Sequence, residues 1–331
     1  MAANKSQTGR TFTRHVAPFA PLALALLMKG APSNQTGAAS TQPHTQPAST
    51  EQATLSTAQA AKCEEVTDFQ DCHSRYPTGC SAAGGYDAAL NLLKDELTPP
   101  STPLKYLTQQ DYASLDAHIP AGLSRNNHGQ FGSQLKDMGE GNVYGLIGYL
   151  YYSQHTGAES SNCDLTAAGP PNDPDYSNVD YHIGIGFDPT VAQSLRGGAV
   201  PAAADANAAL AKRKAKPTSG GTSFPTLQQS SVIVEMTPHY RFHFESGTWT
   251  YDNLQKVVGR QVRVVGQLLI DNEHNLPSQN CATAKTAADK QSCWRASVWE
   301  LHPVMRFQVC SRGTNDCSPN DSAEWVELDQ L

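Results

Sequence analysis

The sequence predicts a mainly β protein built on a small, closed, five-stranded Greek-key barrel. Five strand-like apolar runs lie between residues 141 and 310, and one helical segment falls between the third and the fourth run. Glycines recur within these runs and suit the strong coiling of a small barrel. Closure would also pair strand edges that are otherwise prone to aggregation.

The strand-like runs cover residues 143–152, 179–187, 231–237, 261–271 and 296–309. The second run, VDYHIGIGF, alternates between large apolar residues and polar or small ones, as a strand with one buried face does. Pro303 indicates a bulge or bend in the last run. The helical segment at 250–258 has one apolar stripe and stops at Gly259. This order is that of an OB-fold, and another antiparallel sandwich is the alternative.

Three segments precede the barrel. Residues 1–30 carry basic residues and then an apolar stretch, which is the layout of a secretory signal; a disordered terminus with a chance apolar patch is the alternative. Residues 31–62 are rich in Ser, Thr, Pro, Gln and Ala, and we expect a disordered tether. Residues 63–140 are expected to form a helical cap with helices at 86–97 and 108–115.

Two further segments depart from the strand pattern. An insertion at 189–228 is rich in Ala, Gly, Pro and Ser, and we expect it to be disordered. Its basic run at 211–216 either contacts an anionic polymer or is simply solvated. Residues 311–331 follow the last strand as a C-terminal tail.

Charge and hydropathy exclude two classes of protein. The 331 residues include 24 Lys and Arg against 31 Asp and Glu, so the formal net charge is −7. We therefore expect no strong electrostatic binding of nucleic acid. The chain has no run of 18 apolar residues, so no transmembrane span is expected in the mature chain. Nothing in the sequence indicates the oligomeric state.

All eight cysteines follow the predicted tether. An even number behind a candidate signal predicts disulfide bonds and a secreted or periplasmic location. Cys281–Cys293 and Cys310–Cys317 are local candidate pairs, and the other four are Cys63, Cys72, Cys80 and Cys163. No pair has the CxxC spacing of a structural zinc site.

Ionisable residues interrupt the apolar strands, where they are rare unless exposed or paired. Asp180 and His182 share one face of the second strand, and Glu235 interrupts the third. Glu300 and His302 share a face of the last strand. Two interpretations stay open. The groups either form hydrogen-bonded pairs that fix the barrel register, or bind a divalent metal ion such as zinc or manganese.

The metal interpretation gives each residue a role. His182, Glu235 and His302 would be the ligands, and Asp180 would orient His182. Asp271 or His274, in LLIDNEH, would be catalytic and handle protons. Such a site suits a metal-dependent hydrolase, for instance a phosphodiesterase or nuclease, although no HExxH-type spacing points to a particular metal.

The leading function is a binding module for a small polar or oligomeric ligand, such as a nucleic acid or a saccharide. Exposed aromatic rings on an OB-fold face stack on bases or sugars, whereas packing in the core is the ordinary role of such rings. The residues expected to contact the ligand are Asp180, Tyr181, Trp249, Arg263, Trp299 and Glu300. A purely structural envelope or surface protein is a third possibility.

Several motifs resemble those of a group of uncharacterised secreted bacterial proteins. They are YDAALNLLKDEL, GLIGYLYY, ESSNC, DYHIGI, VIVEMTP, GRQVRVVGQLLIDNEH and WELHPV, and they span about residues 80–310. The resemblance implies a shared pattern but no activity. In strand order the chain also resembles OB-fold proteins generally, including nucleic-acid binders and thermonuclease-type enzymes. His182, His274 and His302 depart from the thermonuclease pattern, whose two arginines among carboxylates are not matched, so no nuclease activity follows from it.

Overall fold

The computed structural model describes residues 66, 68–79, 88–124, 126–166, 176–196, 224–244 and 249–331. The predicted signal and tether, the middle of the predicted insertion, and Cys63 and Cys80 lie outside these residues. Within the described part, no helix is both long enough and apolar enough to cross a membrane.

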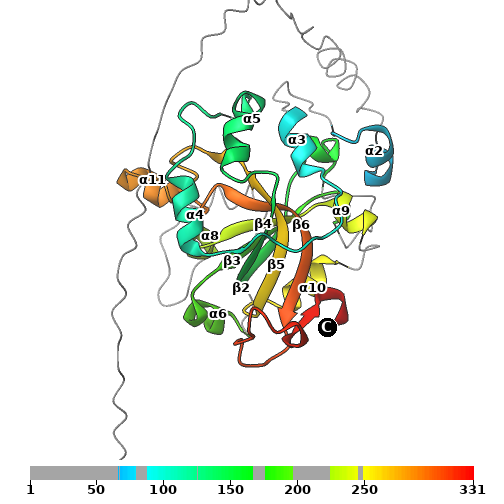
Figure 1. Cartoon of the computed structure of the whole chain (residues 1–331), viewed down its shortest axis with the longest axis vertical. Coiled ribbons are helices and arrows are strands. Elements are labelled where there is room, and N and C mark those ends of the chain that lie inside the picture. The colour runs from blue at the N-terminus through cyan, green and yellow to red at the C-terminus, as the bar shows by residue number, and fades with distance from the viewer. Residues whose placement is uncertain are drawn as a thin grey trace, which may run out of the picture. The chain divides into compact units, whose positions relative to one another are not determined.

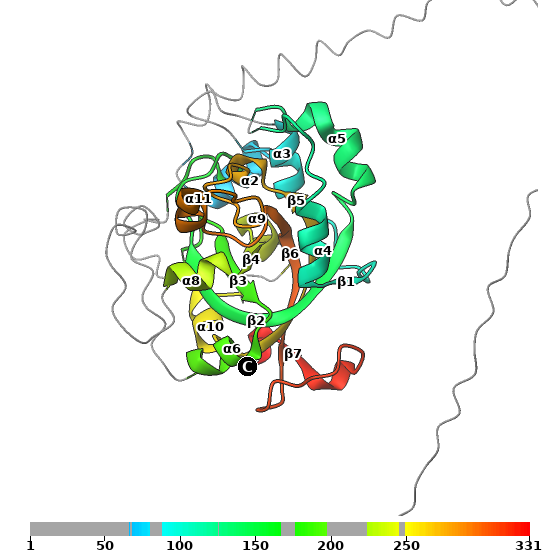
Figure 2. The ribbon, with the colours of Figure 1, turned by 90° about the vertical axis from the view of Figure 1, so that its left-hand side faces the viewer.

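Five strands close into a barrel. They are β2 (Val143–His155), β3 (Tyr181–Gly186), β4 (Val232–Met236), β5 (Gln261–Ile270) and β6 (Trp299–Cys310). Their order is β2-β3-β4-β6-β5, and β5 pairs back with β2 to complete the ring. The pairing of β4 with β6 is parallel and the other pairings within the ring are antiparallel. Figures 1 and 2 show these strands curving around one core, with the long β2 sweeping across the barrel.

This topology confirms the predicted OB-fold-like barrel. The predicted helical segment is present as α10 (Tyr251–Lys256), between β4 and β5, and the short helix α9 (Pro238–His243) precedes it. The predicted bend at Pro303 is also present. The register of β5 and β6 shifts on both sides of Gly266, where an added Cβ would lie 2.7 Å from the carbonyl oxygen of Pro303.

Strand alternation sorts the side chains onto two faces. Ile183 pairs in register with Val234, which pairs with Leu301, and all three belong to the main apolar core. Burying side chains of this size stabilises the fold by about 1.5–3 kcal/mol each. Each of these core residues has polar neighbours in its own strand, and neighbouring side chains point to opposite faces. The opposite face of the three strands therefore carries His182, Glu235, Glu300 and His302.

Helices of the N-terminal cap lie at one end of the barrel (Figure 1). They are α2 (Phe69–Arg75), α3 (Ala88–Lys94), α4 (Gln109–Asp116) and α5 (His128–Asp137), and β1 (Tyr106–Leu107) runs parallel to β2. The predicted helices at 86–97 and 108–115 are thus confirmed as α3 and α4. Thr108 and Asp111 form a capping box that starts α4. A disulfide between Cys72 and Cys163 ties α2 to η2 (Ser160–Asn162), the turn that follows β2.

Two segments are more ordered than expected. The insertion begins with α6 (Pro189–Leu195) and ends with α8 (Phe224–Gln229). Asp188 caps α6 by accepting a hydrogen bond from Thr190, and proline occupies its first turn, so local chemistry starts a helix there. The C-terminal tail contains β7 (Trp325–Glu327), which extends the sheet by pairing with β6. The predicted Cys281–Cys293 and Cys310–Cys317 disulfides are both present.

The remaining described elements are short and lie in the connections. They are α11 (Ala287–Ser292) and the 3₁₀ turns η3 (Asn272–His274), η4 (Ser322–Glu324) and η5 (Leu328–Gln330).

Candidate metal centre

Buried acids and imidazoles gather on the face of β3, β4 and β6 that points away from the apolar core. Asp180 directly precedes β3 and His182 lies in it, Glu235 comes from β4, and Glu300 and His302 come from β6. The register explains the convergence, because His182 is the direct partner of Glu235 and Val234 is that of Leu301. The structure therefore brings together five residues that the sequence marked as interruptions of apolar strands.

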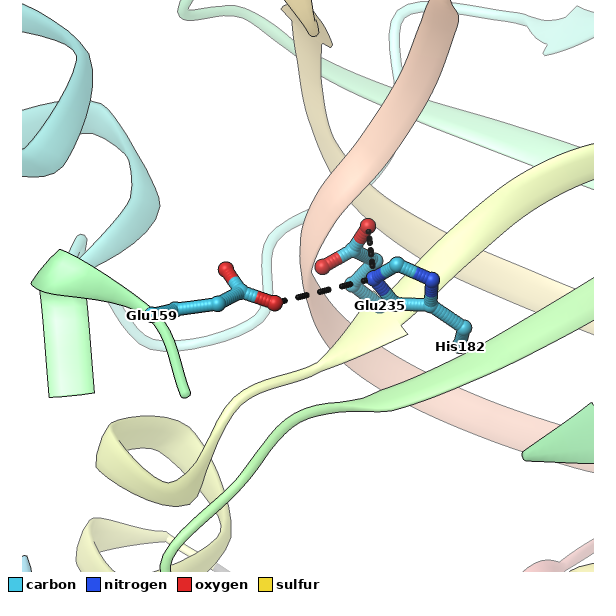
Figure 3. A group of neighbouring side chains, drawn as sticks. All are labelled: Glu159, His182 and Glu235. Atoms are coloured by element: carbon cyan, nitrogen blue, oxygen red, sulfur yellow. Dashed lines mark ion pairs between the residues drawn. The ribbon is translucent and has the colours of Figure 1, made fainter. Parts of the chain in front are cut away.

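The imidazole of His182 lies between two carboxylates. Its Nε2 atom is 2.7 Å from Oε1 of Glu235 and 3.8 Å from Oε1 of Glu159 (Figure 3). Glu159 approaches from the segment between β2 and η2 and is held by Lys94 of α3, whose Nζ atom is 3.2 Å from its Oε2 atom. The turn after β2 thus supplies Glu159, the cap holds it through Lys94, and the barrel supplies Glu235 and His182.

His302 is surrounded by three carboxyl groups. Its Nδ1 atom lies 3.1 Å from Oε1 of Glu300, with hydrogen-bond geometry, and 3.2 Å from Oε2 of Glu235. Its Nε2 atom faces Oδ2 of Asp180 at 3.8 Å. If Nδ1 donates its proton to Glu300, the lone pair of Nε2 points towards Asp180, which is the arrangement of a carboxylate-oriented, metal-ligating histidine.

Three polar atoms of this group lack hydrogen-bond partners within the described part of the chain. They are Oδ2 of Asp180, Oε2 of Glu235 and Nε2 of His302. The three residues are almost completely buried. A buried polar atom without a partner costs about 1–3 kcal/mol, and more when it is charged. Three such atoms on neighbouring residues of one cluster therefore call for a compensating ligand.

Burial is the largest cause of the pKa shifts of these groups. It raises the pKa of Asp180 well above the usual range, and the charge of Glu159 adds to the effect. Burial, followed by the neighbouring Glu300, does the same to the pKa of Glu235. The pKa of His302 is held well below its usual value, mainly by burial, and that of His182 is also lowered. Both imidazoles are thus neutral at pH 7, the form that binds metals.

Glu159 behaves differently from the strand carboxylates. Burial would raise its pKa, but the charge of Lys94, followed by those that His182 and His302 carry when they are protonated at low pH, lowers it to about 2. It therefore stays ionised at the edge of the cluster, where a cation would meet a fixed negative charge.

Asp271 and His274, the predicted catalytic residues, form a neighbouring ion-paired unit. Oδ2 of Asp271 is 2.5 Å from Nδ1 of His274 and 2.7 Å from NH1 of Arg295. Although burial opposes it, the charges of His274 and Arg295 hold the pKa of Asp271 well below its usual range. Arg295 also lies 3.5 Å from Glu300, so this unit reaches the cluster through the carboxyl group that orients His302.

The aromatic residues expected to stack on a ligand are in the core. Tyr181, Trp249 and Trp299 are buried and belong to the main apolar cluster, because their rings are the largest volumes available to fill the barrel and its ends. This corrects the expectation of an exposed stacking face at these residues. Arg263 lies apart from the cluster, and it donates to Gln308 and to the carbonyl of Pro319 while its guanidinium covers the ring of Trp325.

Sequence reasoning missed several members of the site. Glu159, Lys94 and Arg295 lie outside the strand runs, so no interruption of an apolar pattern marks them. It also missed a second polar group, in which His239 contacts Asp95 at 3.2 Å and His73 at 2.9 Å. The motif ESSNC, which begins at Glu159 and ends at Cys163, is a local signal that could have drawn attention to it.

Comparisons with protein families, with curated proteins and with solved structures found no match to this chain. The geometry of the cluster therefore carries the functional argument.

Proposed function

We propose that this protein is a secreted metal-binding module, in which the barrel holds a divalent transition-metal ion between Asp180, Glu235 and His302. Three buried polar atoms carry the proposal: one oxygen from each carboxyl group and one imidazole nitrogen, all without hydrogen-bond partners in the described chain. Closed barrels of this kind commonly serve as binding modules, and the cluster supports a metal ion as the ligand.

The ligand atoms suit such an ion in kind and in spacing. One atom from each of the three residues lies within 4.8 Å of the other two. Imidazole nitrogen and carboxylate oxygen bind zinc at about 2.0–2.2 Å, so ligands of one ion stand up to about 4 Å apart. Small side-chain rotations would complete the coordination. A mixed nitrogen and oxygen set favours zinc or manganese over calcium or magnesium.

Charge balance favours a cation over the alternative of simple ion pairs that fix the barrel register. Five carboxyl groups surround the two imidazoles, against two permanent cations: Glu159, Asp180, Glu235, Asp271 and Glu300, with Lys94 and Arg295. An isolated buried charge is strongly disfavoured unless it is paired, hydrogen-bonded or bound to a metal. If all five were ionised, three negative charges would be in excess; burial opposes this by raising the pKa of Asp180, Glu235 and Glu300, and a divalent ion would allow these carboxyl groups to bind it in their ionised form.

Secretion is supported by the cysteines. The described disulfides are those of a protein that folds in an oxidising compartment, and the signal at residues 1–30 stays a prediction. Membership of the group of secreted bacterial proteins also stays a prediction. Binding of an oligomeric ligand by ring stacking is not favoured, since the rings proposed for it are buried.

Metal analysis of the purified protein tests the proposal. Protein loaded with Zn²⁺ or Mn²⁺ and then dialysed is expected to retain metal, and saturation at 100 times the dissociation constant should stabilise the fold by about 2.7 kcal/mol. His302→Ala and the isosteric Asp180→Asn should lose both effects. His118→Ala, at an exposed position just after α4, is the matched control. Wild-type protein that retains neither metal and shows no stabilisation would leave only the interpretation in which ion pairs fix the register.

A further inference from the structure

We infer that the cluster holds a second divalent ion, between Glu159, His182 and Glu235, and that the resulting two-metal site hydrolyses phosphodiesters. The inference rests on the proposed metal binding at Asp180, Glu235 and His302. It adds a second ligand set, a reaction and a class of substrate.

Glu235 is the residue that both sets share. Its two carboxylate oxygens lie beside different histidines: Oε1 is 2.7 Å from Nε2 of His182, and Oε2 is 3.2 Å from Nδ1 of His302, on the ring whose other nitrogen would bind the first ion. Each set contains ligand atoms within 4.8 Å of one another. In two-metal hydrolytic sites the ions lie about 3.5–4 Å apart, a distance that one carboxylate can bridge with one oxygen on each ion. Glu235 is placed to be that bridge.

The two sets differ in their exposure to solvent. Asp180 and His302 are both 0% exposed, so their ion would be fully enclosed. The side chains of His182 and Glu159 are 13% and 19% exposed. Structural metal sites are closed by protein ligands, whereas catalytic ones keep a position open for water or substrate. The Glu159 side of the cluster is thus the side at which a substrate would bind.

The charge at this open side indicates an anionic substrate. When the five carboxyl groups named above are ionised, two divalent ions together with Arg295 and Lys94, which is 3.2 Å from Glu159, leave an excess of one positive charge. A phosphodiester carries one negative charge and gains more at its leaving oxygen during cleavage. Pairs of divalent ions stabilise both the attacking and the leaving oxygens of such a displacement.

The reaction is a hydrolysis and needs no oxidant or reductant. The oxygen of a water molecule forms a bond to phosphorus, and the bond from phosphorus to the leaving oxygen breaks. One proton of that water passes to solvent, while the electron pair of the broken bond stays on the leaving oxygen. With bis(p-nitrophenyl) phosphate the products are p-nitrophenyl phosphate and p-nitrophenolate.

Metal stoichiometry and hydrolysis together test the inference on the full chain. Wild-type protein loaded with Zn²⁺ or Mn²⁺ and dialysed is expected to retain two equivalents and to hydrolyse bis(p-nitrophenyl) phosphate. Glu159→Gln should retain one equivalent and lose more than about 100-fold in rate, because even partners of metal ligands contribute 10–100-fold. Asp137→Asn, on the exposed surface of α5, is the control and should match wild type in both measurements.

Each other outcome overturns a distinct statement. One equivalent in wild type, kept by Glu159→Gln and lost by Asp180→Asn, overturns the second ion but leaves the proposed metal binding intact. No retained metal overturns both. Two equivalents without hydrolysis of bis(p-nitrophenyl) phosphate overturn the activity. Circular dichroism of each variant separates loss of metal from loss of fold, and Glu235→Gln should remove both equivalents from a folded protein.

Discussion

Replacing Arg295 by methionine is expected to destabilise the fold strongly, because its guanidinium is the charge partner of two buried carboxyl groups. Arg295 is 0% exposed, and its NH1 atom lies 2.7 Å from Asp271 and 3.5 Å from Glu300. The ring of Trp294 covers the guanidinium, with 4.3 Å from its central carbon to the ring centroid. Methionine keeps much of the aliphatic length and removes the charge.

The magnitude follows from the geometry. Removing one partner of a buried ion pair costs about 3–5 kcal/mol, and the loss of a desolvated cation–π contact adds up to about 2 kcal/mol. His274 keeps a contact of 2.5 Å to Asp271, so we expect the lower end, about 3 kcal/mol. In a protein of this size each kcal/mol lowers the midpoint of thermal unfolding by about 2–4 °C, which gives about 6–12 °C.

Urea denaturation followed by tryptophan fluorescence measures the loss of unfolding free energy. Arg306→Met is the matched control, because its side chain is 42% exposed and lies 3.9 Å from Glu327, so the loss should stay below about 1 kcal/mol. The double variant Arg295→Met, Asp271→Leu should be less destabilised than the sum of its single changes, since the carboxylate nearest to Arg295 is removed together with its partner. Equal losses in Arg295→Met and Arg306→Met would refute the reasoning.

Three further outcomes are expected. Gly184→Ala should lower the unfolding free energy by about 1–3 kcal/mol, because the added Cβ would lie 2.1 Å from the ring of Tyr152. Gly157→Ala is the control in the same denaturation experiment and should have little effect, because the space around Gly157 is open. Removing the Cys72–Cys163 disulfide, whose cysteines are 91 residues apart, should lower the unfolding free energy by about 4–5 kcal/mol, and it should weaken Zn²⁺ binding because the disulfide fixes the turn beside Glu159. Removing the Cys281–Cys293 disulfide, with a separation of 12, should lower the unfolding free energy by about 3 kcal/mol and leave Zn²⁺ binding unchanged. The pKa of Asp111 is lowered to about 2, chiefly by the hydrogen bond from Lys105. The contribution of Asp111 to stability is therefore complete above about pH 4 and is lost as the pH falls towards 2. Asp111→Asn should remove that part of the pH dependence in thermal unfolding scans, and an unchanged profile would contradict this prediction.

The barrel could be predicted because its signals are local. Alternation in 179–187 and a single helix before the fourth strand depend on neighbouring residues alone, and both are present as β3 and α10. The strand-borne members of the cluster could also be predicted, because Glu235 interrupts an apolar run and must be paired or bound when buried. Whether the aromatic rings point into the core or towards solvent could not be predicted, since aromatic residues occupy either face of a barrel strand.

The cap-side members of the cluster could not be predicted from their own segments. Glu159 and Lys94 are 65 residues apart and meet only when α3 packs beside the turn after β2. The Cys72–Cys163 disulfide joins α2 to the same turn, and the spacing left its pairing among four cysteines open. Long-range contacts of this kind have no local pattern, so the open side of the cluster became visible only in three dimensions.

The parallel pairing of β4 with β6 has a consequence for the order of folding. In the sheet β6 lies between β4 and β5, although it follows both in the chain, so the ring stays open until the last long strand arrives. Such non-local pairing makes assembly slow. A nascent chain that ends before residue 299 carries Asp180, His182 and Glu235 but lacks His302. The ion proposed between Asp180, Glu235 and His302 would thus be acquired only by chains completed through this strand, at the final stage of assembly.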